Sequence, residues 1–182
     1  YAPSMWGERD GEGWSLVQYW KMPAKVVAQL DNPTLPWAIV LKRFLDAPCK
    51  DVDNETKMIH QRLKLICRVA NQEEVELGSF EKGLIQQYNA KPVLTRPQHA
   101  FFKGKTDGGV PYFEAVLDAH DFNLIARKGL NSLLDRIKDM VLDISFCMEG
   151  HSNDELPETL LGCYRLNRVD MSVAAQPLPD AE

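Results

Sequence analysis

The sequence lacks any apolar run long enough to cross a bilayer, which takes roughly 18 to 20 residues. The longest candidate, 140–148, is interrupted by Asp143 and Ser145. A secretory signal and an initiating Met are also missing, because the chain begins at Tyr1. We therefore expect either a fragment or a mature form that has lost a targeting peptide. A mature form points to a plastid or a mitochondrion, whereas the alternative is a protein that meets a membrane from the cytosol.

The sequence also lacks a positive excess and a metal-binding cysteine pattern. Its 21 Lys and Arg residues face 26 Asp and Glu residues, so the net charge is −5. This balance argues against nucleic acid as a partner. The four cysteines are not arranged as CxxC pairs or beside histidines, which predicts reduced thiols rather than a zinc site. They are Cys49, Cys67, Cys147 and Cys163.

Catalytic motifs are missing as well. The stretch "KGKT" at 103–106 is similar to a phosphate loop, but His99 stands where such a loop needs Gly. The stretch "DVDNE" at 51–55 is similar to a calcium loop, but Thr56 takes its obligatory Gly position. His120 lies between aspartates on what we expect to be the wet face of a strand, and no Ser stands in a nucleophile elbow. We predict no enzymatic activity, no metal and no cofactor.

The composition that remains is that of an ordinary globular protein, with 45% hydrophobic and 26% charged residues among 182. Such a length predicts one domain. We expect an N-terminal arm at 1–13, a single α+β domain at 14–170 and an extended tail at 171–182. In the domain, a curved antiparallel sheet packs on one main amphipathic helix, and the chain closes with a C-terminal β-hairpin.

Alternating apolar and polar residues predict most of the strands. The run His60–Val69 places Leu63, Leu65 and Cys67 on one side and basic residues on the other. A hairpin is predicted from "FFKGKTDGGVPYFEAVLDAH", with Phe113, Ala115 and Leu117 buried in its second strand. Two further strands are expected at 15–22, where Trp20 is assigned to the core, and at 37–44.

Helical spacing and capping residues predict three helices. The first is brief, at 23–30, and a polar loop at 45–57 follows the second strand. The second, at 79–88, has Ser79 as its expected cap. The third, at 122–137, is the clearest and has Asp121 as its expected N-cap. Within this helix, Gly129 lowers helix stability relative to alanine, unless another part of the chain packs close to it and needs the space.

The stretch 140–149 fits a helix or a strand, and its β-branched and aromatic residues favour the strand. The polar "GHSNDELPE" then leads back through "LLGCYRLN" as a long hairpin. In this register Cys147 and Cys163 are cross-strand neighbours, and the closing strand contributes Leu160, Tyr164 and Leu166 to the core.

Several of these segments together resemble one known family. The matching residues are Arg62, Lys64, Leu65 and Ile66; Tyr112, Phe113, Glu114 and Asp118; Ala126, Arg127 and Gly129; Val141, Leu142 and Asp143; and Leu156, Pro157, Glu158, Leu160, Leu161, Gly162, Arg165 and Leu166. This pattern is similar to the C-terminal domain of the plant enhanced-disease-resistance-two proteins. The resemblance runs from Pro36 to Asp170, and it places "PWAIVL" on the family's first core strand.

The resemblance implies a lipid- or membrane-associated role, because relatives in plants carry this domain beside lipid- and phosphoinositide-binding domains. It brings no established catalytic residue. We therefore expect a non-catalytic module whose partner is a lipid or a membrane surface. The alternative is a structural accessory subunit of a larger membrane-protein assembly in an organelle, with the N-terminal arm and the C-terminal tail lying on protein subunits.

Basic residues supply the candidate ligand contacts, because arginine binds phosphate in bidentate fashion. A joint anion clamp of Arg165 and Arg168 needs a bulge, since the two point to opposite faces of a regular strand. The predicted head-group contacts are Arg62, Lys64, Arg127, Arg165 and Arg168.

Overall fold

The computed structural model describes residues 15–50, 52–94, 99–118, 122, 124–134 and 136–174. Its helices are α1 (Ala24–Asp31), α2 (Pro36–Asp46), α3 (Asn54–His60), α4 (Ser79–Tyr88), α5 (Leu124–Leu134) and α6 (Met171–Ala174), with short 3₁₀ turns η2 (Ile137–Asp139) and η3 (Asn153–Glu155). Its strands are β1 (Leu63–Val69), β2 (Pro92–Leu94), β3 (His99–Lys105), β4 (Pro111–Leu117), β5 (Val141–Met148) and β6 (Leu160–Asn167).

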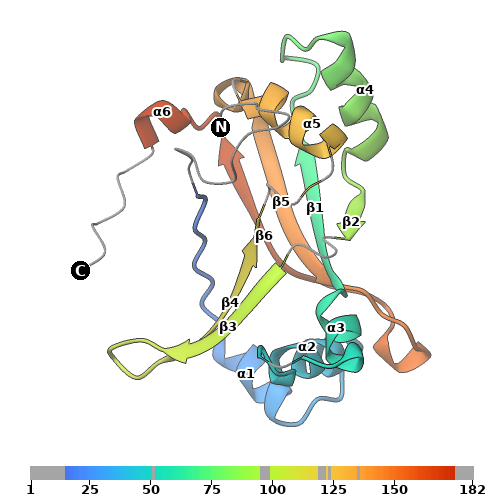
Figure 1. Cartoon of the computed structure of the whole chain (residues 1–182), viewed down its shortest axis with the longest axis vertical. Helices are drawn as coiled ribbons and strands as arrows, with labels where there is room; N and C mark the ends of the chain where they lie inside the picture. The colour runs from blue at the N-terminus through green and yellow to red at the C-terminus, as the bar shows by residue number, and fades with distance from the viewer. Residues whose placement is uncertain are drawn as a thin grey trace.

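The fold is α+β, as expected. Strands β2, β1, β5 and β6 form an antiparallel sheet in that order, and β3 pairs with β4 as a separate hairpin. Figure 1 shows α2 and α3 at the lower end of the four-stranded sheet and α4 and α5 at its upper end. The β3–β4 hairpin projects beside the lower end. The predicted main helix α5 therefore shares the cover of the sheet with other helices.

Two hydrophobic clusters cover the two ends of one sheet face. The lower core combines Val40 and Phe44 of α2 with Leu63, Phe101 and Met148 from the strands. The upper core gathers Val69, Val75, Ile85 and Met140, with Leu133 of α5 packed against them. Leu63 and Met148 pair at one end of β1, while Val69 pairs with Leu142 at the other. The clusters are thus separated by most of the length of β1.

The predicted strand at 37–44 is wrong, because Pro36–Asp46 is helix α2. A short apolar run does not distinguish a strand from a buried helix. Here Pro36 occupies the first helical turn, where its missing N–H costs nothing. The buried residues then follow helical spacing, with Val40 and Phe44 four apart and Ala38 and Leu41 three apart.

Three local predictions near the N-terminal half are also corrected. Residues 15–22 are extended but have no strand partner within the described chain, and Trp20 is 48% exposed. The expected loop at 45–57 ends early, because α3 begins at Asn54 with Asp53 as its cap. Helix α4 was predicted correctly, but its N-cap is Gly78 and not Ser79.

Helix α5 is shorter than predicted, since Leu124–Leu134 gives way to the 3₁₀ turn η2. Gly129 is explained by the packing of Leu84 from α4, because a Cβ there would lie 2.7 Å from Leu84 Cδ1. The expected cap Asp121 lies outside the described residues, as do the arm at 1–13 and most of the tail. The tail does not start extended, because Met171–Ala174 is helical.

The hairpin of β5 and β6 is confirmed, but its predicted register is wrong. Cys163 faces Ser145, and Cys147 faces Leu160 across a bulge that leaves Leu161 as the extra residue. The bulge turns Leu160 away from the core, so this residue is exposed, while Leu161 packs against the lower core. Tyr164 and Leu166 are half-buried, in line with the expectation.

The hairpin of β3 and β4 is also confirmed. Phe101 and Phe113 lie on its inner face and reach the lower core. Leu117 is half-buried, whereas Ala115 is exposed and not buried as predicted. The two strands join through a tight turn in which Gly109 has a φ of 76°, the left-handed region that suits glycine.

A buried histidine sits among the aromatic rings of the lower core. The His60 ring lies 4.3 Å from that of Phe101 and 5.7 Å from that of Phe44, and the residue is 7% exposed. Its Nε2 has no hydrogen-bond partner within the described chain. Burial lowers the pKa of His60, and the Lys103 ammonium lowers it further. The ring is therefore neutral in the folded protein at neutral pH.

We predict that acidification from pH 7.5 to 5.5 destabilises the protein through His60. Below its ordinary pKa of 6.5 the unfolded chain takes up a proton that the folded chain refuses. The free energy of unfolding then falls as the pH falls, by about 1 kcal/mol at pH 5.5. Urea titrations at both pH values measure this loss.

The matched control is His60→Leu, which keeps an apolar side chain and removes the titration. Its stability should change less than that of the wild type over the same interval. The carboxylates with lowered pKa values titrate below this range, so they do not confuse the comparison. Equal losses in both proteins contradict the assignment to His60.

Candidate functional site

Four of the five predicted head-group residues are paired with carboxylates of this same chain. Their partners come from different elements, so the four do not converge on one point. The pairs are Arg62 with Glu155, Lys64 with Glu158, Arg165 with Asp143, and Arg168 with Glu74. A phosphate arriving at any of them has to compete with a carboxylate that is already in place.

The Glu155 carboxylate is the most deeply buried charge of the described chain, with 1% of the residue exposed. Arg62 donates to both of its oxygens at 2.9 and 3.0 Å, and Arg43 donates to one at 2.6 Å. The backbone N–H of His151 donates to the other at 2.7 Å. Burial alone raises the pKa of Glu155, but these donors outweigh it and hold the pKa below its ordinary value.

Lys64 lies beside this centre on β1 and is largely buried. Its ammonium is 2.8 Å from one oxygen of Glu158, which also accepts the backbone N–H of Gly150 at 3.1 Å. Burial raises the pKa of Glu158, yet the bonds from Lys64 and Gly150 lower it by more. The pair therefore holds the β5–β6 connection against the lower end of the sheet.

Arg165 and Arg168 do not form the joint clamp. The Arg165 guanidinium makes a bidentate pair with Asp143 of the neighbouring strand, at 2.6 and 2.8 Å. This bond lowers the pKa of Asp143. Arg168 follows the end of β6 with a φ of 51° and donates to Glu74 at 2.7 Å. The two arginines thus serve different neighbours.

Arg127 of α5 differs from the other four. It is half-buried, and its Nε is buried without a hydrogen-bond partner within the described chain. No carboxylate pairs with it in that part of the chain. Among the predicted residues, Arg127 is therefore the one without a carboxylate partner in the described part of the chain.

A shallow depression of 430 Å³ lies on the surface of α2 and α3. Ile39, Ala47 and Ile59 supply apolar lining, and Lys42 and Arg43 supply charge. Both cations are again engaged inside the chain, because Lys42 pairs with Asp46 at 2.9 Å and Arg43 with Glu155. The depression therefore offers less to an anion than its lining suggests.

The apolar face of the four-stranded sheet offers a better site between the two cores. Rows of paired residues cross the sheet there, with Leu65, Phe146 and Gly162 in one row and Cys67, Ile144 and Tyr164 in the next. We call these six residues the central strip. Cys67 is exposed and the others are half-buried, so the cover of the strip is incomplete.

The N-terminal segment covers one side of the central strip. The Trp20 ring makes edge contacts with the rings of Phe146 at 6.0 Å and Tyr164 at 5.7 Å. It lies over Gly162, where a Cβ would come within 2.6 Å of the indole. The side chain of Gln18 also donates a hydrogen bond to the Tyr164 hydroxyl. Glycine in the signature "LLGCYRL" is thus required by the tryptophan that packs on it.

The other side of the central strip is less covered, because Cys67 at its β1 end is exposed. The surrounding protein atoms still raise the pKa of this thiol, to about 11. Burial also raises the pKa of Tyr164 to about 12, and the nearby Cys67 contributes to this rise. The strip is therefore accessible to water at Cys67, but a negative charge there is unfavourable.

Sequence reasoning found the strands of this site but not the site. The alternation around Leu63, Leu65 and Cys67 indicated one buried face, and no local signal tells that the middle of that face is left open. In the described residues, no three His, Cys, Asp or Glu side chains gather in a way that could hold a metal ion. None of the described helices combines the length and apolarity needed to cross a membrane.

Comparison with known proteins identifies a family. The family described as "Protein ENHANCED DISEASE RESISTANCE 2, C-terminal" matches residues 2–170. The match starts well before Pro36, so it includes Gln18 and Trp20. The chain has no significant match among curated proteins or solved structures.

We predict that Glu155→Gln lowers the free energy of unfolding by about 3 kcal/mol, because it leaves two arginines without their buried counter-charge. The matched control is Asp143→Asn, which breaks the exposed pair with Arg165 and should cost at most about 1 kcal/mol. Urea unfolding of both variants measures the difference. Similar losses mean that the Glu155 centre is not the stronger of the two.

We further predict that Gly162→Ala displaces Trp20 and destabilises the protein by about 1 to 2 kcal/mol. The same substitution in a Trp20→Ala background should be nearly neutral, because the clash is then absent. Gly162→Ala should speed tryptic cleavage after Lys21 when Trp20 is present. In the Trp20→Ala background the same substitution should leave the cleavage rate unchanged. Additive losses in the double variant contradict the contact.

Proposed function

This chain belongs to the family of the C-terminal domain of the ENHANCED DISEASE RESISTANCE 2 protein, and on that premise we propose that it is a non-catalytic module that associates with lipid at a membrane surface. The observation that carries the proposal is an exposed apolar surface on the projecting β3–β4 hairpin. Family membership supports the domain type, and the hairpin supplies a contact surface.

The hairpin is a ribbon with apolar side chains on both faces. Its inner face is used by the lower core, through Phe101 and Phe113. On the opposite face, Phe102 is 46% exposed, Tyr112 45% and Val116 39%, and Glu114 opposite Phe102 adds one exposed carboxylate. We call Phe102, Tyr112 and Val116 the outer face. A tight two-stranded ribbon does not need a second apolar face to fold, so the outer face is surplus to the core of the described chain.

Such a surface fits the interface of a bilayer. Aromatic side chains favour the boundary between head groups and hydrocarbon, and Val110 adds an exposed aliphatic group beside the turn. Lys105 ends β3 near the same turn and suits an anionic surface. Figure 1 shows the hairpin extending away from the sheet, so its turn reaches a flat surface before the body does. This contact is small, and the association it supports is reversible.

The head-group contacts proposed from sequence need a revision in this light. Arg62 and Lys64 are engaged with Glu155 and Glu158 and are largely buried. Arg165 and Arg168 are more exposed, but their carboxylate partners are also in place. We therefore assign first contact with the membrane to the outer face, and we keep Arg127 as the cation that a head group can engage without breaking a pair.

A second candidate is the accessory subunit of a larger assembly. One observation favours it: the hairpin contains only β3 and β4, so neither has a second strand neighbour in the described chain. An added strand from a partner subunit can pair with such an edge. In that case the outer face contacts protein and not lipid.

We predict that Phe102→Glu weakens binding to vesicles of phosphatidylcholine with phosphoinositide at least about tenfold, because it removes an aromatic ring from the outer face and places a second carboxylate opposite Glu114. Co-sedimentation of the purified chain measures the loss. Native mass spectrometry of the same protein checks for retained lipid.

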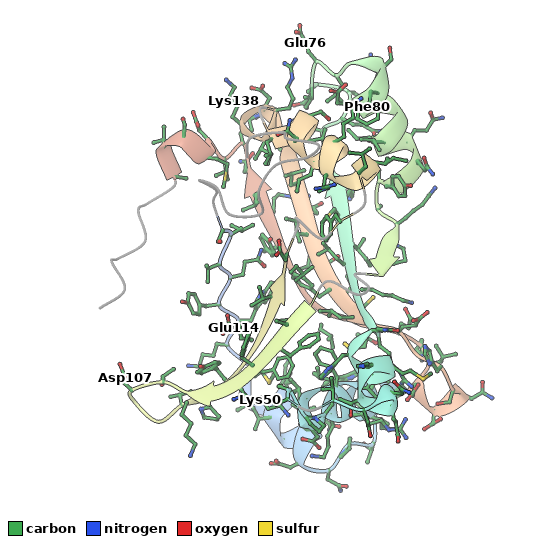
Figure 2. All side chains as sticks on the ribbon, viewed as in Figure 1. Lys50, Glu76, Phe80, Asp107, Glu114 and Lys138 are labelled. Atoms are coloured by element: carbon green, nitrogen blue, oxygen red, sulfur yellow. The ribbon has the colours of Figure 1, made fainter. Side chains whose placement is uncertain are left out.

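The matched control is Phe80→Glu, on α4. Phe80 is 40% exposed, and Figure 2 places it at the end of the molecule opposite the hairpin turn that carries Asp107. It should leave vesicle binding unchanged. Equal weakening by both variants points to net charge rather than to the hairpin. If the wild type neither sediments with vesicles nor retains lipid, the lipid proposal fails and the subunit candidate takes its place.

A further inference from the structure

The central strip combines an accessible apolar floor with an unsatisfied polar group at its side. We propose that it binds one neutral lipid that carries a hydroxyl group, with the hydrocarbon over Cys67 and the hydroxyl at Gln18 and Tyr164. This inference rests on the lipid association proposed above and adds the site and the ligand class. The strip lies on the sheet and not on the hairpin, so the two can be tested apart.

The dimensions of the strip suit a single chain or ring system. Its two rows are two residues apart along β1, or about 7 Å, and they cross three strands, or about 10 Å. The two cores close it at both ends, and Trp20 bounds it on the β6 side. Hydrocarbon laid over Cys67 and Leu65 replaces water on an apolar floor, which is favourable in proportion to the area covered.

The polar edge of the strip supplies the reason for a hydroxyl. Gln18 donates from Nε2 to the Tyr164 oxygen, while its Oε1 is buried and has no partner in the described chain. Turning the amide over exchanges the two atoms and still leaves one of them unsatisfied. A hydroxyl accepts the Tyr164 O–H and donates to Gln18 Oε1, or the reverse. An unsatisfied buried group destabilises the fold, so a ligand that satisfies Gln18 Oε1 removes a penalty.

Charge is disfavoured at this place. Burial raises the pKa of Cys67 to about 11 and that of Tyr164 to about 12, which means that the surroundings resist an anion. The ion pair of Asp143 with Arg165 lies on the opposite face of the sheet, one row away from Tyr164. Arg165 is therefore directed away from the strip and does not stabilise a carboxylate or a phosphate there. A neutral ligand meets none of these obstacles.

The chain provides a matched pair of thiols for the test. Cys67 is exposed on the face that carries the strip, and Cys163 is exposed on the opposite face. Both are alkylated with iodoacetamide at pH 8.5, and the rates are followed by site-resolved mass spectrometry. We expect slow reaction at Cys67, because a pKa about two above the ordinary 9.0 lowers its thiolate population about 100-fold.

The probes share one hydrocarbon chain and differ in the polar end. They are oleyl alcohol, methyl oleate, which lacks the hydroxyl, and oleate, which is charged. We expect oleyl alcohol to slow alkylation of Cys67 at least about tenfold and to leave Cys163 unchanged, with less protection from methyl oleate and least from oleate. Gln18→Leu should remove the preference for the alcohol over the ester.

Substitutions at the same two positions complete the test. Cys67→Phe places a large ring on the β1 side of the central strip and should abolish retention of oleyl alcohol, whereas Cys163→Phe should retain it. Both should still bind vesicles through the hairpin. Vesicle binding without protection of Cys67 overturns this inference and leaves the membrane proposal standing. Equal protection by alcohol and oleate overturns the assignment of a neutral ligand.

Discussion

The buried carboxylate of Glu155 is the constraint on which the arrangement of the lower half depends. A carboxylate with 1% exposure is tolerated only where donors compensate for lost water, and here Arg43, Arg62 and the His151 N–H do so. These groups come from α2, from the entry to β1 and from the β5–β6 connection. One anion therefore ties together three parts of the chain that lie far apart in sequence.

Paired charges and apolar residues are likewise separated onto opposite faces of the sheet. On one face, Lys64, Asp143 and Arg165 are satisfied by partners within the chain. The other face carries the two cores and the central strip, where Cys67 and Tyr164 have pKa values raised by burial. A sheet so divided presents neutralised charge on one side and apolar surface on the other. That division is the reason for proposing a neutral ligand for this domain in place of the anionic one expected from its arginines.

Much of the fold was predictable because strand alternation is a local signal. It correctly placed β1, the β3–β4 hairpin and the β5–β6 pair. It failed at Pro36–Asp46, where a short apolar run had no alternation to interpret and Pro36 permitted a helix start. The register error at Cys163 was a slip of two residues, which keeps the side chains from Gly162 to Leu166 on their predicted faces, so hydrophobic patterning had no power to reject it.

The site was harder to predict because its contacts join residues that are distant in sequence and individually unremarked. Arg62, Lys64 and Arg165 were predicted as ligand contacts because basic side chains bind phosphate. Their carboxylate partners can be identified only once the pairing of the strands is known. Both members of the pairs Lys64–Glu158 and Asp143–Arg165 belong to the pattern that carries the family resemblance. The family pattern thus includes ion pairs that hold different strands and loops of the fold together. Gln18, Cys67 and Phe102 are not among the residues of that pattern, and they carry the surfaces where function is proposed. A shared architecture therefore does not by itself specify the ligand.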